Sequence, residues 1–456
     1  MDSYLKKLES IGLAVPEILL PARDTDLEKW AVIACDQFTQ DSGYWENLKR
    51  EIGDAPSTLN MILPEAYLNG KDIDERIKAI HQTMKRYLQR QPGADSVFAL
   101  PRNAGVLVER TTHHNRMRHG LVAALDLEQY DWKPDACLPV RASESVIEER
   151  LPARMQIRRN APVELPHVIL LYNDEDDLLF PFLEKLLRNA PYIYNCPLNA
   201  GGGSIRGKLI CRKTDWNFIG DYFAHITRSS HTEADAFVFA VGDGNHSLAA
   251  AKAVWEEYKQ AYGDNPEIMK HPARWALVEI ENIYDPGLVF EPIHRLLFNV
   301  SPELLLNTLS GLPGYSLREM ETPEALAALV AEKNVPYNRY GLVFGGSKPQ
   351  PPLLVETADS RISTVPLDPL LDTALNEARK GAHPADVQID YVHETGALLN
   401  ALARAEMSAG IILPPFNRKS LFPTLAAHGP LPRKSFSMGE AREKRYYLES
   451  RRLFDE

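Results

Sequence analysis

The chain has 456 residues, of which 44% are hydrophobic and 25% charged, a composition typical of a water-soluble globular protein with two or three domains. Its formal net charge of −11 argues against nucleic acid or an anionic membrane surface as a general partner, because both attract positively charged proteins. No apolar run approaches the ~20 residues of a membrane-spanning helix, and the first residues lack a signal-peptide pattern, so we expect a cytoplasmic location.

Cysteine and histidine usage gives no metal-site pattern. The four cysteines lack CxxC spacing, which argues against structural zinc and against a disulfide framework. His113, His114 and His119 lie close together in the sequence, but exposed turn histidines are commoner than zinc ligands when no cysteine or carboxylate accompanies them. We therefore predict no metal site from these side chains.

The first half of the chain alternates strand-like and helical patterns. Residues 30–35 and 168–172 are apolar runs, and each predicts a buried strand. Residues 105–110 and 120–126 flank a polar turn rich in His and Arg, which predicts a β-hairpin. Residues 236–241 predict another apolar strand, and an amphipathic helix follows it whose apolar face comprises Leu248, Ala251, Val254, Trp255, Tyr258 and Tyr262.

The second half contains helix-start patterns. Ser301 and Thr322 each precede a Pro and a Glu, as in an N-cap followed by a first-turn Pro and an acidic first turn. Residues 395–408 predict a further helix, which Gly410 ends before a strand at residues 411–413.

The mixture of elements favours an α/β or α+β fold with mixed sheets and flanking helices. A composition shift near residues 263–266 predicts a domain boundary. We expect a ligand- or phosphate-binding domain over residues 1–265 and a second, smaller α/β domain over residues 266–456. A boundary near residue 300 is the alternative.

The strongest functional signal is the motif GDGNHS, which follows an apolar strand and comprises Gly242, Asp243, Gly244, Asn245, His246 and Ser247. Its glycines permit a sharp turn and close approach to a ligand, and the free N–H groups of the next helix favour anions. We expect the glycines, the Asn and the Ser to bind a phosphate or carboxylate, and Asp243 and His246 to be catalytic. The alternative is a tight turn in which the Asn or the Ser caps the helix.

Residues 201–207, GGGSIRG, are a second candidate for anion binding. The successive N–H groups of Gly202, Gly203 and Ser204 could form a nest around an anion. Arg206 could add a bidentate contact to phosphate or carboxylate. The alternative is a flexible surface loop, where glycines are common.

Residues 141–145, RASES, place a carboxylate between small residues. Glu144 could act as a general base or metal ligand, and Arg141 could bind an anionic substrate. The alternative is an ordinary solvated helix of mixed charge, because the sequence EER follows at residues 148–150.

Two further pairs of residues are candidates for substrate binding. Asp36 and Gln37 follow the strand predicted at residues 30–35, and strand ends in open α/β sheets commonly line ligand crevices. Asp36 could hold substrate or a divalent cation, or it could cap the next helix. His294 and Arg295 pair a potential base with a fixed positive charge.

Taken together, these motifs resemble the bacterial domain-of-unknown-function family 1015. The resemblance extends over nearly the entire chain, and the residues that carry it are 34–45, 56–60, 107–132, 141–145, 201–207, 241–257 and 432–439. It implies a common fold but no particular activity.

A second resemblance is confined to the GDGNHS turn and its flanks. A strand, an acidic turn containing Gly and an Ala-rich helix are similar to the phosphate-binding element of the ParB/sulfiredoxin-like superfamily, which includes free-serine kinases. The superfamily's DGxHR loop aligns with this turn through His246, but Ser247 stands where that loop has Arg. The resemblance implies that another basic residue supplies the missing charge, and Arg206 and Arg295 are the candidates.

The sequence thus predicts an enzyme that binds a small phosphorylated or phosphorylatable metabolite. We expect it to transfer a phosphoryl group or hydrolyse a phosphate ester, with serine or phosphoserine metabolism as the specific hypothesis. Arg206 would neutralise charge on the transferred group, and Mg²⁺ and a nucleotide are the expected cofactors. The alternative is a non-catalytic sensor of a nucleotide or metabolite.

Overall fold

The computed structural model describes residues 3–89, 96–230, 237–263, 265–346, 350–381, 384–405 and 407–454. The chain divides into two compact units: unit 1 comprises residues 1–288 and 439–456, and unit 2 comprises residues 289–438. The sequence placed the boundary at 265 or near 300. Composition alone does not reveal that the chain returns to unit 1 after residue 438, because that return depends on long-range packing.

Unit 1 is built on a mixed sheet. Neighbouring strands are antiparallel except for three parallel pairs, β12–β7, β13–β9 and β6–β7. In spatial order the strands are β10 (Tyr192–Leu198), β11 (Gly203–Ile210), β4 (Gly105–Thr111), β5 (Met117–Asp126), β13 (Trp275–Asn282), β9 (Ile169–Tyr172), β12 (Phe239–Asp243), β7 (Val140–Ala142) and β6 (Tyr130–Asp131), and β1 (Leu13–Ala14) pairs with β5.

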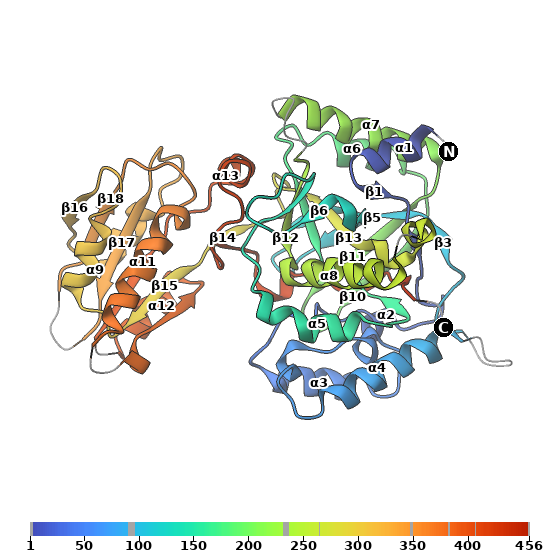
Figure 1. Ribbon diagram of the computed structural model, residues 1–456, viewed down its shortest axis with the longest axis horizontal. Coiled ribbons are helices and arrows are strands. Elements are labelled where there is room, and N and C mark those ends of the chain that lie inside the picture. The colour runs from blue at the N-terminus through green and yellow to red at the C-terminus, as the bar shows by residue number, and fades with distance from the viewer. Residues whose placement is uncertain are drawn as a thin grey trace. The chain divides into compact units, whose positions relative to one another are not determined.

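The helices of unit 1 cover this sheet and extend its core. Two of them, α5 and α8, lie side by side in Figure 1, and α1 packs on α7. The helices are α1 (Ser3–Ser10), α2 (Leu27–Trp30), α3 (Ser42–Ile52), α4 (Ile73–Leu88), α5 (Leu151–Arg158), α6 (Leu179–Leu186), α7 (Lys213–Ser230) and α8 (Asn245–Tyr262).

Most of the strands and helices predicted for unit 1 are confirmed. The hairpin is β4–β5, residues 169–172 form β9, and the apolar strand before GDGNHS is β12, although residue 236 lies outside the described residues. On α8 the predicted face is buried up to Trp255, whereas Tyr262 is 53% exposed because the helix runs past the core at its end.

The strand predicted at residues 30–35 is wrong. Trp30 ends α2, and the following residues are extended and buried but make only an isolated bridge, Ile33 to Tyr446. Their backbone bonds instead with the C-terminal segment, where Ala34 N–H donates to the carbonyl of Arg445 and Tyr447 N–H donates to that of Val32. The sequence shows the burial of this run but not its partner.

The C-terminal segment, residues 439–454, is part of the core of unit 1. Tyr446, Tyr447 and Leu448 are at most 1% exposed. β22 (Arg451–Arg452) pairs with β8 (Val163–Glu164), and β2 (Glu17–Ile18) pairs with β3 (Arg102–Asn103). Charged groups of the segment are buried as ion pairs: Arg445 contacts both Glu279 and Glu449. Such pairs specify one arrangement strongly because an unpaired buried charge is costly.

Unit 2 contains an antiparallel sheet with helices on both faces. The strand order is β16 (Ser316–Glu319), β18 (Leu353–Glu356), β17 (Arg339–Phe344), β20 (Ser408–Ile412), β15 (His294–Phe298) and β19 (Gln388–Val392). Leu296 and Leu297 belong to different apolar clusters, as do Ile411 and Ile412, because successive strand residues face opposite sides. The fold class predicted from the sequence, α/β with mixed sheets, is confirmed.

The helices of unit 2 agree in part with the sequence. Ser301 and Thr322 cap their helices by accepting from Leu304 N and Ala325 N, as predicted. The elements are α9 (Pro302–Leu309), α10 (Pro323–Val330), α11 (Thr364–Ala378), α12 (Thr395–Leu402), α13 (Leu421–His428) and the ribbon of β14 (Phe290–Pro292) with β21 (Phe436–Met438).

The predicted role of Gly410 is wrong. It lies within β20, and α12 ends earlier, at Leu402. A Cβ at this glycine would lie 2.6 Å from Leu402 Cδ1, so the residue permits close packing of the strand on the helix rather than ending a helix. Across the described helices of both units, none is both long and apolar enough to cross a membrane.

Candidate functional site

The GDGNHS motif forms the junction between β12 and α8. β12 ends at Asp243, Gly244 has φ of +82°, and α8 begins at Asn245. A Cβ on Gly244 would lie 3.1 Å from both Cα and Cγ2 of Val168, so the turn needs glycine for its conformation and for its approach to β9. The first N–H groups of α8 have no partner within the helix and form an electropositive end.

The RASES segment is brought to this turn. Asn245 Oδ1 accepts from Ser143 N–H at 3.1 Å, and its amide donates to Ser143 Oγ at 3.3 Å. His246 Nε2 accepts from Ile147 N–H at 3.1 Å, so this lone pair is engaged by the protein's own backbone. Glu144 lies between these contacts and is half-buried. The two motifs therefore lie side by side, and both make structural contacts there.

Asp243 is held by a lysine that the sequence did not single out. Its Oδ1 accepts from Gly244 N–H at 3.0 Å, and its Oδ2 lies 3.2 Å from Lys444 Nζ. Lys444 belongs to the buried C-terminal segment. The local positive charge at the turn comes from this lysine.

Ser247 belongs to a chain of hydrogen bonds that enters the protein interior. Its Oγ lies 2.9 Å from His167 Nε2, and His167 Nδ1 lies 2.8 Å from the hydroxyl of Tyr447. The same hydroxyl accepts from Cys35 N–H at 3.1 Å. Asp36 Oδ2 is 3.8 Å from His167 Nε2. A hydroxyl, an imidazole and a carboxylate are thus assembled from three distant parts of the sequence.

The surroundings determine which of these groups can ionise. Burial, followed by the charge of Asp36, raises the pKa of the Cys35 thiol to about 12, so this cysteine is not a thiolate nucleophile at neutral pH. Burial also raises the pKa of Tyr447 well above its usual value, which keeps this hydroxyl neutral. Asp36 accepts from its neighbour Gln37 through Oδ1, at 2.9 Å. Neither Cys35 nor Tyr447 is therefore ionised at neutral pH, and the imidazole of His167 lies beside Ser247 with the carboxylate of Asp36 3.8 Å from it.

A cavity of about 140 Å³ adjoins this chain of groups. Its polar lining includes His167, Ser247, Glu65 and Arg154, and its walls are largely apolar, with Met61, Ile62, Leu63, Leu68, Met84, Ile157, Leu248 and Ala251 among them. Arg154 contacts Glu65. Burial raises the pKa of Glu65, while Arg154 opposes that rise. An apolar cavity with a few convergent polar groups is typical of a small-molecule site.

The predicted glycine nest is a hairpin turn between β10 and β11. Gly202 N–H donates to Asn199 O at 3.0 Å, and a Cβ on Gly202 would lie 2.3 Å from the Tyr446 hydroxyl. Gly203 has φ of +85°, and its Cβ would lie 2.2 Å from the carbonyl oxygen of Thr111. The carbonyl oxygen of Ser204 accepts a hydrogen bond from Arg110 Nη1 at 3.5 Å. These glycines are explained by the protein's own packing.

The arginines predicted to bind an anion make contacts with other residues, and Arg206 lies away from the 242–247 turn. Arg206 pairs with Glu109 on the neighbouring strand β4, so it is separated from β12 by β4, β5, β13 and β9. Arg141, on β7, donates to Leu138 O at 3.0 Å and stacks on Phe237, with 4.6 Å from Cζ to the ring centroid.

His294 and Arg295 are core residues of unit 2. His294 Nδ1 accepts from Leu413 N–H at 3.1 Å, and burial followed by the charge of Arg295 lowers the pKa of this histidine to about 4. Arg295 is fully buried and pairs with Asp368 at 2.8 Å. The histidine is neutral at pH 7, and the arginine is neutralised within its own unit, so both have a structural role there.

His167, Tyr447 and Lys444 were missed by the sequence reasoning. Their partners are distant in the chain: the sequence separation is 80 for His167 and Ser247 and 280 for His167 and Tyr447. The available signal was indirect. The sequence ELPH precedes β9, whose amino end lies beside the carboxyl end of the antiparallel strand β12, and carboxyl ends of strands commonly line crevices.

The family model described as protein of unknown function, DUF1015, matches residues 19–357. The chain belongs to this family. No curated protein matches the sequence.

Solved structures give weaker similarities for this DUF1015 member. A free serine kinase in complex with AMP has 9% identity and a TM-score of 0.37 over 73% of this chain and 91% of that chain. The same kinase with ADP has 8% identity, a TM-score of 0.36 and the same coverage. A conserved hypothetical protein from Pyrococcus furiosus has 9% identity and a TM-score of 0.33, over 72% and 90% of the two chains.

Proposed function

We propose that unit 1 is a phosphoryl-transfer enzyme that binds a nucleotide or another phosphorylated small molecule at the start of α8. The observation that carries this proposal is the contact between Ser247 and His167, at 2.9 Å, where the first turn of α8 meets the cavity. An anion-binding helix end, a titratable base and an apolar cavity meet at one place.

The start of α8 and the apolar cavity would bind different parts of the ligand. The phosphate would lie against the first N–H groups of α8, where the helix dipole favours negative charge. Arg154, which lines the cavity and pairs with Glu65, would add a positive charge by exchanging that carboxylate for the phosphate. The apolar walls would take the non-phosphate part of the ligand, as an adenine ring or a short aliphatic group requires.

The chemical role belongs to His167. Its Nε2 already accepts or donates a hydrogen bond at Ser247, so a substrate hydroxyl or water bound there would be within reach of a general base. Asp36, 3.8 Å away, would stabilise the imidazolium that forms when the proton is taken up. Asp243, at the end of β12, and Asp36 are the carboxylates that would hold Mg²⁺ beside the phosphate, because carboxylate oxygens are the ligands that this ion prefers.

The first test is a thermal-shift screen of the full chain against nucleotides, phosphoserine, serine and sugar phosphates, each with and without Mg²⁺. A ligand at 100 times its dissociation constant should stabilise unit 1 by about 2.7 kcal/mol. Product formation is then followed with the ligands that shift the melting temperature. Binding of a ligand without any turnover would support the alternative function, a non-catalytic sensor of a nucleotide or metabolite.

Variants separate the proposed roles. His167→Ala should lower turnover by roughly 10²–10⁴-fold while ligand affinity changes little. Ser247→Ala should change affinity as well as turnover. His428→Ala, an exposed histidine of unit 2, is the matched control and should change neither. Unchanged turnover in His167→Ala would rule out its role as the base.

A further inference from the structure

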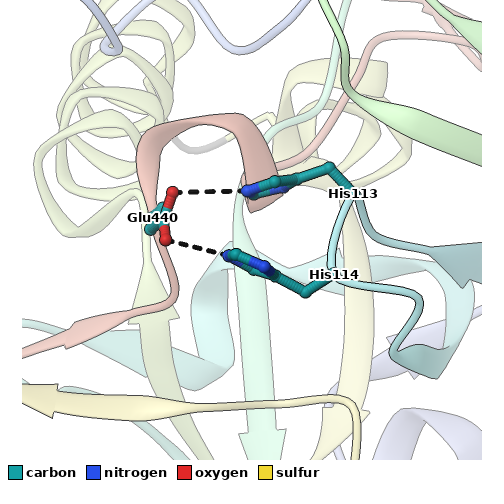
Figure 2. A group of neighbouring side chains, drawn as sticks. All are labelled: His113, His114 and Glu440. Atoms are coloured by element: carbon teal, nitrogen blue, oxygen red, sulfur yellow. Dashed lines mark hydrogen bonds and ion pairs between the residues drawn. The ribbon is translucent and has the colours of Figure 1, made fainter.

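Two neighbouring histidines converge on one carboxylate at another place in unit 1. His113 and His114 lie in the turn between β4 and β5, and Glu440 lies at the start of the C-terminal segment (Figure 2). His113 Nε2 is 3.4 Å from Glu440 Oε2, and His114 Nε2 is 2.9 Å from Glu440 Oε1. Each carboxylate oxygen therefore faces one imidazole nitrogen.

The two loops that carry these side chains are held together by other contacts. Thr112 N–H donates to Arg116 O at 2.9 Å and closes the histidine turn. Arg116 in turn pairs with the buried Glu443 at 2.6 Å, and Glu443 Oε2 accepts from Glu440 N–H at 2.9 Å. The backbone positions of the three converging side chains thus do not depend on the contacts among them.

We propose that His113, His114 and Glu440 bind a divalent transition-metal ion of the zinc class. One ligand atom from each residue can be chosen so that all three lie within 4.8 Å of one another. Two ligands at ~2.1 Å from a tetrahedral metal lie roughly 3.4 Å apart. His113 Nε2 lies at that distance from Glu440 Oε2, whereas His114 Nε2, 2.9 Å from Glu440 Oε1, makes a hydrogen bond that a metal ion would replace. Two imidazoles and a carboxylate favour zinc-class ions over Mg²⁺ or Ca²⁺.

The free energy of an ion pair is too small to explain why two histidines and a carboxylate converge here. The side chains of Glu440 and His114 are 51% and 43% exposed, and exposed pairs contribute only about 0–1 kcal/mol. The two imidazole rings lie with their centroids 3.9 Å apart and their planes tilted by 39°. A bound dication gives both rings a neutral role as ligands and leaves a fourth position open to water or an anion.

The glycine hairpin packs against this site. A Cβ on Gly203 would lie 3.1 Å from His113 N, and one on Gly201 would lie 3.3 Å from an Nη1 of the exposed Arg442. The hairpin, the histidine turn and the C-terminal segment thus meet at the site. The sequence did not reveal a carboxylate partner for these histidines, because Glu440 is 326 residues away from His114 in the chain.

The test uses the full-length protein without a polyhistidine tag, stripped of metal by a chelator and titrated with Zn²⁺ by calorimetry. We expect one tight equivalent. Glu440→Gln, which keeps the size of the side chain, and His114→Ala should each weaken binding at least ~10-fold. His428→Ala is the matched control and should bind as the unaltered chain does. Circular dichroism melts verify that each variant is folded.

Cobalt provides a second readout that identifies the ligands. Bound Co²⁺ should show the visible bands of a nitrogen- and oxygen-ligated ion, and Glu440→Gln should lose them. A thiolate charge-transfer band that disappears in Cys137→Ser or Cys211→Ser would place the metal at a cysteine and overturn the proposal. Equal Zn²⁺ affinity in Glu440→Gln and the unaltered chain would overturn it as well. Neither measurement depends on turnover, so the result is independent of the proposed function.

Discussion

The turns at residues 242–247 and 201–207 both combine glycines with a serine and a basic or imidazole side chain, yet the structure uses them differently. At the first, Asp243, Asn245 and Ser247 make contacts with three other segments beside a cavity. At the second, Gly202 and Gly203 make room for the protein's own Tyr446 and Thr111.

The difference shows what a glycine cluster can and cannot indicate. Gly244 is also required by a close neighbour, Val168, so in both turns the glycines are explained by packing. What separates a candidate site from a structural turn is the convergence of ionisable side chains next to unfilled space. That convergence depends on residues that are distant in the sequence, such as His167 and Lys444.

The largest expected effect is a loss of stability on substituting a glycine of the 201–207 turn. Gly203→Ala places a Cβ 2.2 Å from a carbonyl oxygen at a positive φ, so we expect a loss of about 3 kcal/mol in the free energy of unfolding. Urea denaturation measures this loss. Gly396→Ala is the control, because a Cβ there meets nothing within 4 Å. Equal stability of Gly203→Ala and the unaltered chain would show that this turn is a flexible loop.

A pH effect of similar size is expected beside the 242–247 turn. Burial raises the pKa of Glu281 from 4.5 to about 7; Arg118 opposes this shift, and the charges of Asp285 and Asp243 add to it. Because the folded state keeps this proton between pH 4.5 and 7 while the unfolded state loses it, stability should fall by up to about 3 kcal/mol as pH rises through that window.

Glu281→Gln should remove this part of the pH dependence. Denaturation midpoints measured at intervals from pH 4 to pH 8 give the slope for each protein. A slope that persists unchanged in the variant would assign the titration to another group.

A smaller effect is expected at the first turn. Gly244→Ala brings a Cβ within 3.1 Å of Val168 at a φ of +82°, which should cost about 1–2 kcal/mol and shift the start of α8. Ligand affinity should fall together with stability here, whereas Gly203→Ala that remains folded should keep its affinity. Thermal shifts with and without a ligand found in the screen separate the two effects.

The smallest effect is expected at Arg206. Its side chain is 40% exposed, and the amide of Arg206→Gln can still donate to the buried Glu109, so the variant should lower stability by about 1 kcal/mol. Affinity for phosphorylated ligands should stay unchanged, because its strand is separated from β12 by four others. A tenfold loss of affinity in this variant would show that both turns contribute to one site.

Local patterns in the sequence predicted the local structure of unit 1 well. The β12–α8 junction, the β4–β5 hairpin and strand β9 all follow from period, turn residues and apolar runs. These features are set by residues within one or two elements.

Features that depend on pairing across the chain could not be predicted in this way. Residues 30–35 were predicted to form a strand because they are apolar. They are extended, but their backbone bonds with the C-terminal segment and makes only an isolated bridge. Arg295 was a candidate anion-binding residue because it places a fixed positive charge beside His294, yet Asp368 neutralises it in the core. Burial and partners of charges are properties of the tertiary structure.

The return of the chain to unit 1 after residue 438 sets an order of events during protein synthesis. Glu440, Lys444 and Tyr447, which contact the histidine pair, the 242–247 turn and His167 respectively, emerge from the ribosome only after all of unit 2. At ~5–20 residues per second, the interval between residues 288 and 439 is roughly 8–30 s. During that time the first 288 residues lack the segment that completes their core, and chaperones have their longest opportunity to act on them.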